Sequence, residues 1–290
     1  MRRACIDIGS NTTRLLVADC AGGEITEVHQ ERAFTHLAWS GLAGGAIAPD
    51  KLEEVAATVA DQAATARRLG CARIQAVATA AIRRAPNGAE LTQAVRDACG
   101  LEVEILTPQE EARLAFVGAA RGFGHVGEAS LGVVDVGGGS SELVVGHVPD
   151  RISWSASFPL GSSDLARSYL RSDPPSPEEM AEARAEVEAR LGGLEVPRPA
   201  EAAAVGGSAA SLARLAGRIL DPAAFARALA ELLGAPRREV ARRFGLDVER
   251  ARLLPAGLLI LQAASERFGA PLVVAGGGLR EGLLMEAAGG

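Results

Sequence analysis

The chain has 290 residues, of which 48% are hydrophobic and 23% charged, and its net charge is −6. This is the composition of a folded globular protein with enough apolar material for two domains. The negative charge argues against non-specific binding to nucleic acid or to a membrane surface, since both need a positive field, although a local group of arginines can still bind an anionic substrate.

The cysteines and the first residues of the chain predict a cytoplasmic protein. The first residues, MRRACIDIGS, lack the apolar run of a signal peptide, and no window of ~18 apolar residues predicts a membrane span. The four histidines are scattered and the cysteines form no C-x-x-C pair, so we expect no zinc site and a reducing compartment. The cysteines are Cys5, Cys20, Cys71 and Cys99.

The first part of the chain predicts a set of strands and helices. Two strands joined by a tight Gly-Ser-Asn turn come first, and a helix runs from an Asp50 N-cap to a Gly70 stop. Thr107 is a suitable N-cap for a later helix that has Pro108 at its first position. We expect strands at 4–8, 13–20, 74–78 and 101–106, and helices at 50–70, 90–98 and 108–121.

The segment 122–130 contains three glycines and predicts a linker. It divides the chain into domain I, residues 1–122, and domain II, residues 123–278, with the C-terminal helix 279–290 assigned to domain I. In domain II we expect strands at 131–136, 142–148, 202–205 and 272–275, and helices at 177–192, 208–220, 221–233, 236–244 and 248–268. The helix that returns to domain I is expected at 279–288.

An internal similarity links the two halves. DIGSNTTRLLVA at 7–18 resembles DVGGGSSELVVG at 135–146, and each reads as a strand, Asp-x-Gly, a small polar turn and a second strand. The separation is too long for a solenoid repeat. It predicts two similar domains that each open with the same hairpin.

These turns are candidates for phosphate binding. Glycine lets the backbone approach a ligand closely, and consecutive N–H groups in such a turn bind phosphate oxygens. An aspartate at the end of the preceding strand can hold a divalent metal beside that phosphate. The alternative is that the glycines only make tight turns. The candidates are Asp7, Gly9, Ser10 and Asn11 in the first turn, and Asp135, Gly137, Gly138, Gly139 and Ser140 in the second.

Two further glycine turns lie between a strand and a helix, at Gly206-Gly207-Ser208 and at 276–278. There a helix N-terminus adds N–H groups and the positive end of its dipole, which favours an anion. Close packing of strand and helix is the alternative interpretation, and for 276–278 both stay open.

The segment TPQEEARL at 107–114 holds two glutamates in the first turn of the predicted helix. Glu110 is three residues after Thr107 and can complete a capping box. Glu111 is not needed for capping, and the helix dipole favours its ionised form. Such a carboxylate can order and deprotonate an attacking water, so Glu111 is the candidate general base. A plain first-turn glutamate is the alternative.

Arginines follow several of the turns, at Arg14, Arg83 and Arg280. The forked donors of a guanidinium match phosphate oxygens, so we expect at least one of these arginines to contact a phosphate. A solvated surface charge is the alternative for each.

Taken together, these segments resemble the exopolyphosphatase / guanosine pentaphosphate phosphohydrolase family. The resemblance extends in order over nearly the whole chain. It is carried by DIGSNTTRLLV, ATAAIRRAPNG, TPQEEARL, VVDVGGGSSELVVG, SFPLGSSDLARSY, AVGGSAASLARLAG, LLPAG and GGGLREGLL.

The resemblance implies an α/β fold of two actin-like (ribonuclease H-like) domains, each a mixed five-stranded sheet flanked by helices, with the active site in the cleft between them. It implies an Mg²⁺-dependent exopolyphosphatase. By position, Asp7 to Arg14 resembles the first phosphate loop and Asp135 to Glu142 the second. Glu111 matches the catalytic glutamate and Arg83 a phosphate-contacting arginine. Asp135 and Glu142 match acidic residues tied to magnesium and to catalysis, and we add Asp7 as a third metal candidate.

The sequence departs from the family pattern at two positions and at its end. Arg84 stands where an acidic residue is common, and Pro108 where a glycine is common. The chain ends after the LREGLL helix, so it resembles a short form without the C-terminal helical domain, which favours shorter polyphosphate chains.

Several functions remain open at this point. Inorganic polyphosphate is the expected substrate, with guanosine pentaphosphate as a second. An ATP-dependent small-molecule kinase of the same superfamily and a non-enzymatic nucleotide-binding sensor or actin-like assembling protein are the alternatives. We expect no nucleic-acid partner and no membrane association, and a homodimer stays an open alternative.

Overall fold

The computed structural model describes residues 1–22, 24–37, 45–123 and 129–289. The chain forms two compact units, one of Met1–Leu114 with Leu279–Gly290 and the other of Ala115–Gly278. Most of the predicted linker at 122–130 lies outside the described residues, because 124–128 are not described. Each unit has its own sheet and its own core.

The first unit is built on a five-stranded mixed sheet in the order β3-β2-β1-β4-β5. β1 runs antiparallel to β2, so that the two form the predicted hairpin, and parallel to β4. The strands are β1 (Arg2–Ile8), β2 (Thr12–Ala21), β3 (Glu24–Phe34), β4 (Arg73–Ala78) and β5 (Val103–Ile105).

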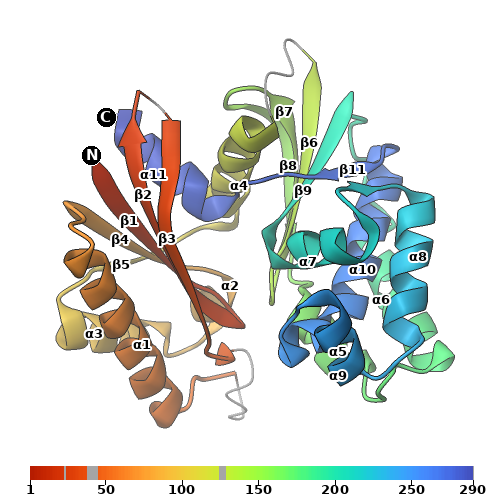
Figure 1. Ribbon diagram of the computed structural model, residues 1–290, viewed down its shortest axis with the longest axis horizontal. Coiled ribbons are helices and arrows are strands. Elements are labelled where there is room, and N and C mark those ends of the chain that lie inside the picture. The colour runs from red at the N-terminus through yellow and green to blue at the C-terminus, as the bar shows by residue number, and fades with distance from the viewer. Residues whose placement is uncertain (23, 38–44, 124–128, 290) are drawn as a thin grey trace. The chain divides into compact units, whose positions relative to one another are not determined.

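Helices cover both faces of this sheet (Figure 1). α1 (Pro49–Arg68) and α3 (Gly88–Cys99) bury Val55, Val59 and Leu91 against one face. α11 (Leu279–Gly289) and the first turns of α4 (Pro108–Phe123) cover the other. There the backbones meet closely, since a β-carbon at Gly282 would stand 2.1 Å from the carbonyl oxygen of Leu114. A short helix, α2 (Ala80–Arg84), follows β4.

The second unit repeats this plan with a six-stranded mixed sheet in the order β10-β11-β9-β6-β7-β8. β6 is antiparallel to β7 and parallel to β9, as β1 is to β2 and β4 in the first unit. The strands are β6 (Ser130–Val136), β7 (Ser141–His147), β8 (Arg151–Phe158), β9 (Glu201–Val205), β10 (Ile219–Leu220) and β11 (Leu272–Val274).

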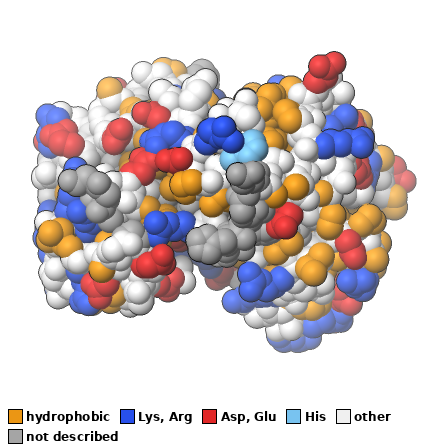
Figure 2. Space-filling model, turned by 90° about the horizontal axis from the view of Figure 1, so that it is seen from above, with side chains coloured by type: hydrophobic (Ala, Val, Ile, Leu, Met, Phe, Trp, Pro, Cys, Tyr) orange, Lys and Arg blue, Asp and Glu red, His pale blue; other side chains and the backbone are white. Residues whose placement is uncertain are grey.

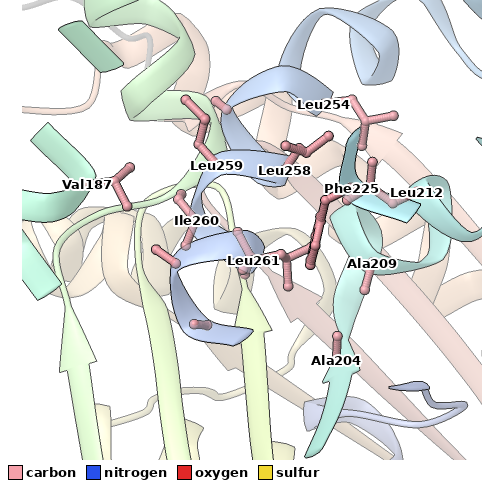
Figure 3. Packing of buried hydrophobic residues seen from close by; sticks show 14 of the residues in the cluster. Val187, Ala204, Ala209, Leu212, Phe225, Leu254, Leu258, Leu259, Ile260 and Leu261 are labelled. Carbon is pink, nitrogen blue, oxygen red and sulfur yellow. The ribbon is translucent and has the colours of Figure 1, made fainter. Parts of the chain in front are cut away.

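A layer of helices covers one face of the second sheet. Its centre is α10 (Val248–Phe268), whose Leu258, Leu261 and Phe268 are buried. Figure 3 shows α10 packed among Val187, Ala204, Leu212 and Phe225, which come from neighbouring elements. This core is aliphatic, as expected for a chain with 3% aromatic residues. The other helices are α5 (Ser162–Tyr169), α6 (Pro177–Leu191), α7 (Gly206–Ala216), α8 (Pro222–Leu233) and α9 (Arg237–Phe244).

The predicted fold class is confirmed, with one difference in strand number. The second sheet carries the two-residue β10, whereas five strands were expected. β10 arises because α7 ends at Ala216 and Gly217 turns the chain at φ 91, so the predicted helix 208–220 is too long at its end. None of the helices in the described ranges is both long and apolar enough to cross a bilayer.

Other expectations about local structure were wrong. The helix predicted from an Asp50 N-cap begins at Pro49 after an Ala48 N-cap, because proline suits the first helical position. The strand predicted at 101–106 is shortened to β5. β3, β8, α2 and α5 were not predicted. β3 is a mostly exposed edge strand, and β8 alternates serine with apolar residues, so neither has a strong apolar pattern.

Candidate functional site

The two Asp-x-Gly turns have the same backbone geometry. The N–H of Gly9 donates to the carbonyl oxygen of Thr12 at 3.0 Å, and the N–H of Gly137 donates to that of Ser140 at 2.9 Å. A β-carbon at Gly9 would stand 3.1 Å from the first of these oxygens, and one at Gly137 3.0 Å from the second. The internal similarity of the sequence is therefore a similarity of structure. Each first glycine closes its own turn.

In the first unit, Asp7 lies directly opposite Arg14 on the β1–β2 ladder. The Oδ1 atom of Asp7 is buried and has no hydrogen-bond partner among the described residues. Burial raises the pKa of Asp7, while the positive charges of Arg14 and Arg280 oppose that shift. A buried carboxylate oxygen without a partner is costly, and it suits a group that accepts a cation or a proton from outside the protein.

Asn11 occupies the tip of the first turn and is 5% exposed. Its carbonyl oxygen accepts hydrogen bonds from the N–H groups of Thr35 and His36, both at 3.1 Å. Its Nδ2 atom is buried and lacks a hydrogen-bond partner within the described ranges. Ser10, the remaining member of this turn, is also buried. The turn is thus anchored to the end of β3 and keeps one amide donor for a ligand.

In the second unit, Asp135 lies opposite Glu142 on the β6–β7 ladder, so the two carboxylates share one face of the sheet. Glu142 is buried and accepts a hydrogen bond from the Ser157 hydroxyl at 2.9 Å. In the first unit, Arg14 occupies the position that corresponds to Glu142. The first hairpin therefore places a basic residue opposite its aspartate, whereas the second places an acidic residue there.

Gly206 brings a second predicted phosphate loop to this pair of acids. It opens α7 with φ 85, and a β-carbon there would stand 2.4 Å from Oδ1 of Asp135. Gly207 accepts the Ser211 hydroxyl at 2.7 Å through its carbonyl oxygen. Ser208 is buried, and its Oγ has no hydrogen-bond partner in the described part of the chain. The structure thus joins residues 206–208 to Asp135.

The start of α5 supports the turn at 137–140, and sequence reasoning assigned it no role. The N–H and the hydroxyl of Ser162 both donate to the carbonyl oxygen of Gly137, at 2.9 and 3.1 Å. The N–H of Ser163 donates to that of Gly138 at 3.0 Å. A β-carbon at Gly161 would stand 2.2 Å from Gly138. The sequence signal that could have revealed this helix is the motif FPLGSSDL, because its Gly-Ser-Ser is typical of a helix start.

Glu111 and Arg83, predicted to have separate roles, form an ion pair in the first unit. Glu111 is 4% exposed, and the same Arg83 nitrogen also donates to the carbonyl oxygen of Leu106 at 2.5 Å. The pair requires Glu111 to be a carboxylate, which is the form that accepts a proton from water.

The predicted capping box at the start of α4 is confirmed. The N–H of Thr107 donates to Oε2 of Glu110 at 2.7 Å, and the N–H of Glu110 donates to the Thr107 hydroxyl at 3.2 Å. The hydrogen bonds from Thr107 lower the pKa of Glu110. Capping occupies Glu110, which leaves Glu111 as the first-turn glutamate available for chemistry.

The last glycine turn packs against α4. A β-carbon at Gly118 of α4 would stand 2.0 Å from the carbonyl oxygen of Gly278, so close approach of the two backbones accounts for the glycine at position 118. Arg280 follows this turn and donates to the carbonyl oxygen of Leu15 at 3.4 Å. It belongs to the charged surroundings of Asp7.

Basic and acidic side chains are interspersed with apolar ones on the face shown in Figure 2. Among the described residues, no three His, Cys, Asp or Glu side chains gather as a metal-binding group. Mg²⁺ needs fewer protein ligands than that, because it uses one or two carboxylates together with phosphate oxygens and waters. The Asp135–Glu142 pair and the unpartnered Asp7 Oδ1 both fit this requirement.

Comparison with known proteins agrees with the resemblance seen in the motifs. The model of the Ppx/GppA phosphatase family matches residues 16–289. Exopolyphosphatase 1 of Mycobacterium tuberculosis (strain H37Rv) is 32% identical, covering 98% of this chain and 88% of its own length. Exopolyphosphatase 1 of Mycobacterium leprae is 30% identical, covering 98% and 89%.

Solved structures give the same result. A PPX-GPPA enzyme of Aquifex aeolicus is 30% identical and matches 99% of each chain with a TM-score of 0.80. An exopolyphosphatase of Cytophaga hutchinsonii has a TM-score of 0.89 over 100% of this chain and 98% of its own, at 22% identity, and shows the shared fold.

Proposed function

The chain belongs to the Ppx/GppA phosphatase family, and we propose that it is an exopolyphosphatase that hydrolyses the terminal phosphoanhydride bond of inorganic polyphosphate. The observation that carries this proposal is the pair of equivalent closed turns, at Gly9 and Gly137, each preceded by a strand-end aspartate. Relatives named exopolyphosphatase, which align over most of the chain, support the choice of substrate.

The two turns are proposed to hold the phosphate chain. Because Gly9 and Gly137 close their own turns, the donors to phosphate oxygens come from the residues between the closing hydrogen bonds. These are Ser10 and Asn11 in the first turn, and Gly138 and Gly139 in the second. Ser208 adds a buried hydroxyl, and Arg14 a guanidinium.

Glu111 is proposed as the general base. Its carboxylate takes a proton from a water molecule, the water oxygen bonds to the terminal phosphorus, and the bond from that phosphorus to the bridging oxygen breaks. The products are orthophosphate and a chain one phosphate shorter. Arg83 orients Glu111 through the ion pair and supplies a positive charge near the reacting phosphoryl group.

A divalent cation, Mg²⁺ in our proposal, would be held by Asp135 and Glu142 in the second unit, and Asp7 is the candidate metal ligand of the first unit. When bound, such an ion neutralises negative charge on the phosphate oxygens. Glu142 is oriented for this role by Ser157, and Asp135 by the close backbone of Gly206.

The proposal is tested by measuring phosphate release from tripolyphosphate, long polyphosphate and guanosine pentaphosphate in parallel, with Mg²⁺ and with excess EDTA. We expect Mg²⁺-dependent release from polyphosphate, with short chains favoured and guanosine pentaphosphate as a slower second substrate. No release from any of the three would overturn the proposal.

The same assay separates the alternatives. A small-molecule kinase would leave polyphosphate intact and transfer phosphate from ATP to an acceptor. A nucleotide-binding sensor or an assembling protein would bind ligand without turnover. Either outcome would contradict the proposed exopolyphosphatase activity.

A further inference from the structure

His36 has an unusual backbone conformation beside the first turn. Its φ is 49, and no other non-glycine residue in the described ranges has a positive φ. Left-handed backbone is unfavourable for a residue with a β-carbon, and it persists where the surroundings hold it in place. Such outliers often occur at functional sites.

The contacts of His36 converge on Asn11. The backbone N–H of His36 donates to the carbonyl oxygen of Asn11 at 3.1 Å. Its ring nitrogen Nδ1 lies 3.0 Å from Oδ1 of the Asn11 side chain, and the imidazole N–H is the donor in that hydrogen bond. One residue therefore fixes both the main chain and the carboxamide of Asn11.

The imidazole is itself held by its neighbours on β3. The rings of His36 and Phe34 are stacked, with centroids 5.7 Å apart and planes inclined by 18°. The guanidinium of Arg32 lies 5.0 Å from the centroid of Phe34. The row Arg32–Phe34–His36 thus fixes the plane of the ring whose N–H reaches Asn11.

This arrangement leaves one polar atom of Asn11 for a ligand. With Oδ1 engaged by His36, the carboxamide has a single orientation, in which Nδ2 is buried and has no hydrogen-bond partner among the described residues. A buried amide donor without a partner is costly. An anionic oxygen at the first turn would satisfy it.

We propose that His36 is a positioning residue of the first phosphate loop: it orients the Asn11 carboxamide so that Nδ2 donates to an oxygen of the polyphosphate chain. The inference rests on the proposed function, because it takes the ligand at this turn to be a phosphate. It assigns His36 no contact with the reacting atoms. Its effect on the reaction passes through Asn11.

The test is a double-mutant cycle of His36→Gly and Asn11→Ala, with tripolyphosphate as the probe. Glycine accepts a φ of 49, so His36→Gly removes the imidazole and keeps the backbone conformation. His36→Asn, which also tolerates this conformation, is measured in parallel. His29→Ala is the matched control, since His29 lies on β3, the strand before His36, and is paired with Val17 on β2 rather than with the first turn.

We expect each single variant to raise KM for tripolyphosphate about tenfold, the size of one hydrogen bond to a charged group. The double variant should be no worse than Asn11→Ala alone. His36→Gly should melt at or above the wild-type temperature, and His29→Ala should keep the wild-type KM. A wild-type KM in His36→Gly, or effects that multiply in the double variant, would overturn the inference.

The failure of this inference and the failure of the proposed function can be told apart. A wild-type protein that releases no phosphate contradicts the proposed function. The rise in melting temperature caused by tripolyphosphate reports binding without turnover. A smaller rise in His36→Gly than in wild type is the result expected from positioning, and an equal rise contradicts it.

Discussion

The backbone of Gly206 lies against the carboxylate of Asp135, so closely that a β-carbon at Gly206 would stand 2.4 Å from Asp135 Oδ1. Gly206 opens α7 and Asp135 is near the end of β6, which is the neighbour of β9 in the sheet. Two glycine motifs far apart in the sequence therefore build one site around one carboxylate.

Gly206→Ala should cost at least tenfold in kcat/KM for tripolyphosphate, because the new methyl group must displace the Asp135 carboxylate. The matched control is Gly217→Ala. Gly217 has φ 91 and ψ 175 and nothing within 4 Å of an added β-carbon, so Gly217→Ala carries a backbone cost on the order of 1–3 kcal/mol without the clash. Both variants should melt earlier than wild type. Equal activities in the two would contradict the role given to this contact.

Arg83→Met should lower the free energy of unfolding by up to about 3 kcal/mol, because it removes the guanidinium that pairs with the buried Glu111 carboxylate. Adding Glu111→Gln should restore part of that loss, since the buried charge is then gone. Urea unfolding of the wild type, the two single variants and the double variant measures the coupling free energy between Arg83 and Glu111. Arg84→Met, on the same short helix, should lower the free energy of unfolding less than Arg83→Met does, because the Arg84 side chain is exposed. Additive losses in the double variant would show that the pair contributes no coupling.

Mg²⁺ should raise the melting temperature of the wild-type protein, and Glu142→Gln should weaken that rise. Two carboxylates opposite each other on a ladder repel, and a bound cation relieves the repulsion. Without Mg²⁺, Glu142→Gln should be as stable as wild type or more so. Sodium chloride at matched ionic strength controls for screening. The same Mg²⁺ response in both proteins would remove Glu142 from the metal site.

The start of α6 should contribute a pH-dependent part of the stability. Burial alone would raise the pKa of Glu179, but backbone N–H donors at Ser176, Ser172 and Arg171 outweigh it and lower the pKa. A carboxylate with a lowered folded pKa stabilises the fold above its unfolded pKa, and that stabilisation is lost as pH falls through the folded pKa.

Glu179→Gln should therefore destabilise the protein at about pH 7, and the difference in stability from wild type should shrink as the pH falls below the ordinary pKa of glutamate. Urea unfolding of both proteins across this range measures it. Ser176→Ala, which removes the other half of the capping box, should cost about 1 kcal/mol. A gap that stays constant with pH would show that the hydrogen bonds do not depend on the charge of Glu179.

The features that could be predicted from the sequence are those with a short-range sequence pattern. The two hairpins, the capping box of Thr107 and Glu110, and the strand–helix turn at Gly206 all depend on residues close together in the chain. Glycine and N-cap patterns are strong at that range. The internal similarity extended the prediction to a pair of equivalent turns.

The missing parts depend on contacts between distant segments. The sequence predicted separate roles for Arg83 and Glu111, and only the fold shows that the two side chains form an ion pair. The hydrogen bonds from the start of α5 to the carbonyl oxygens of Gly137 and Gly138 connect two motifs that are far apart in the sequence. His36 lies after β3, an edge strand too exposed to show an apolar pattern, so its contact with Asn11 had no local signal.

The most direct test of the account is phosphate release from tripolyphosphate with Mg²⁺ by the wild type and by Glu111→Gln, with Glu110→Gln as the neighbouring control. Glu111→Gln should lose about 10²–10⁴-fold in rate, the usual contribution of a general base, and keep its ability to bind tripolyphosphate. Glu110→Gln can keep the capping box, because a glutamine oxygen also accepts the N–H of Thr107, and it should keep its rate within a few-fold. A Glu111→Gln enzyme that turns over at the wild-type rate would contradict the assignment of Glu111 as the base.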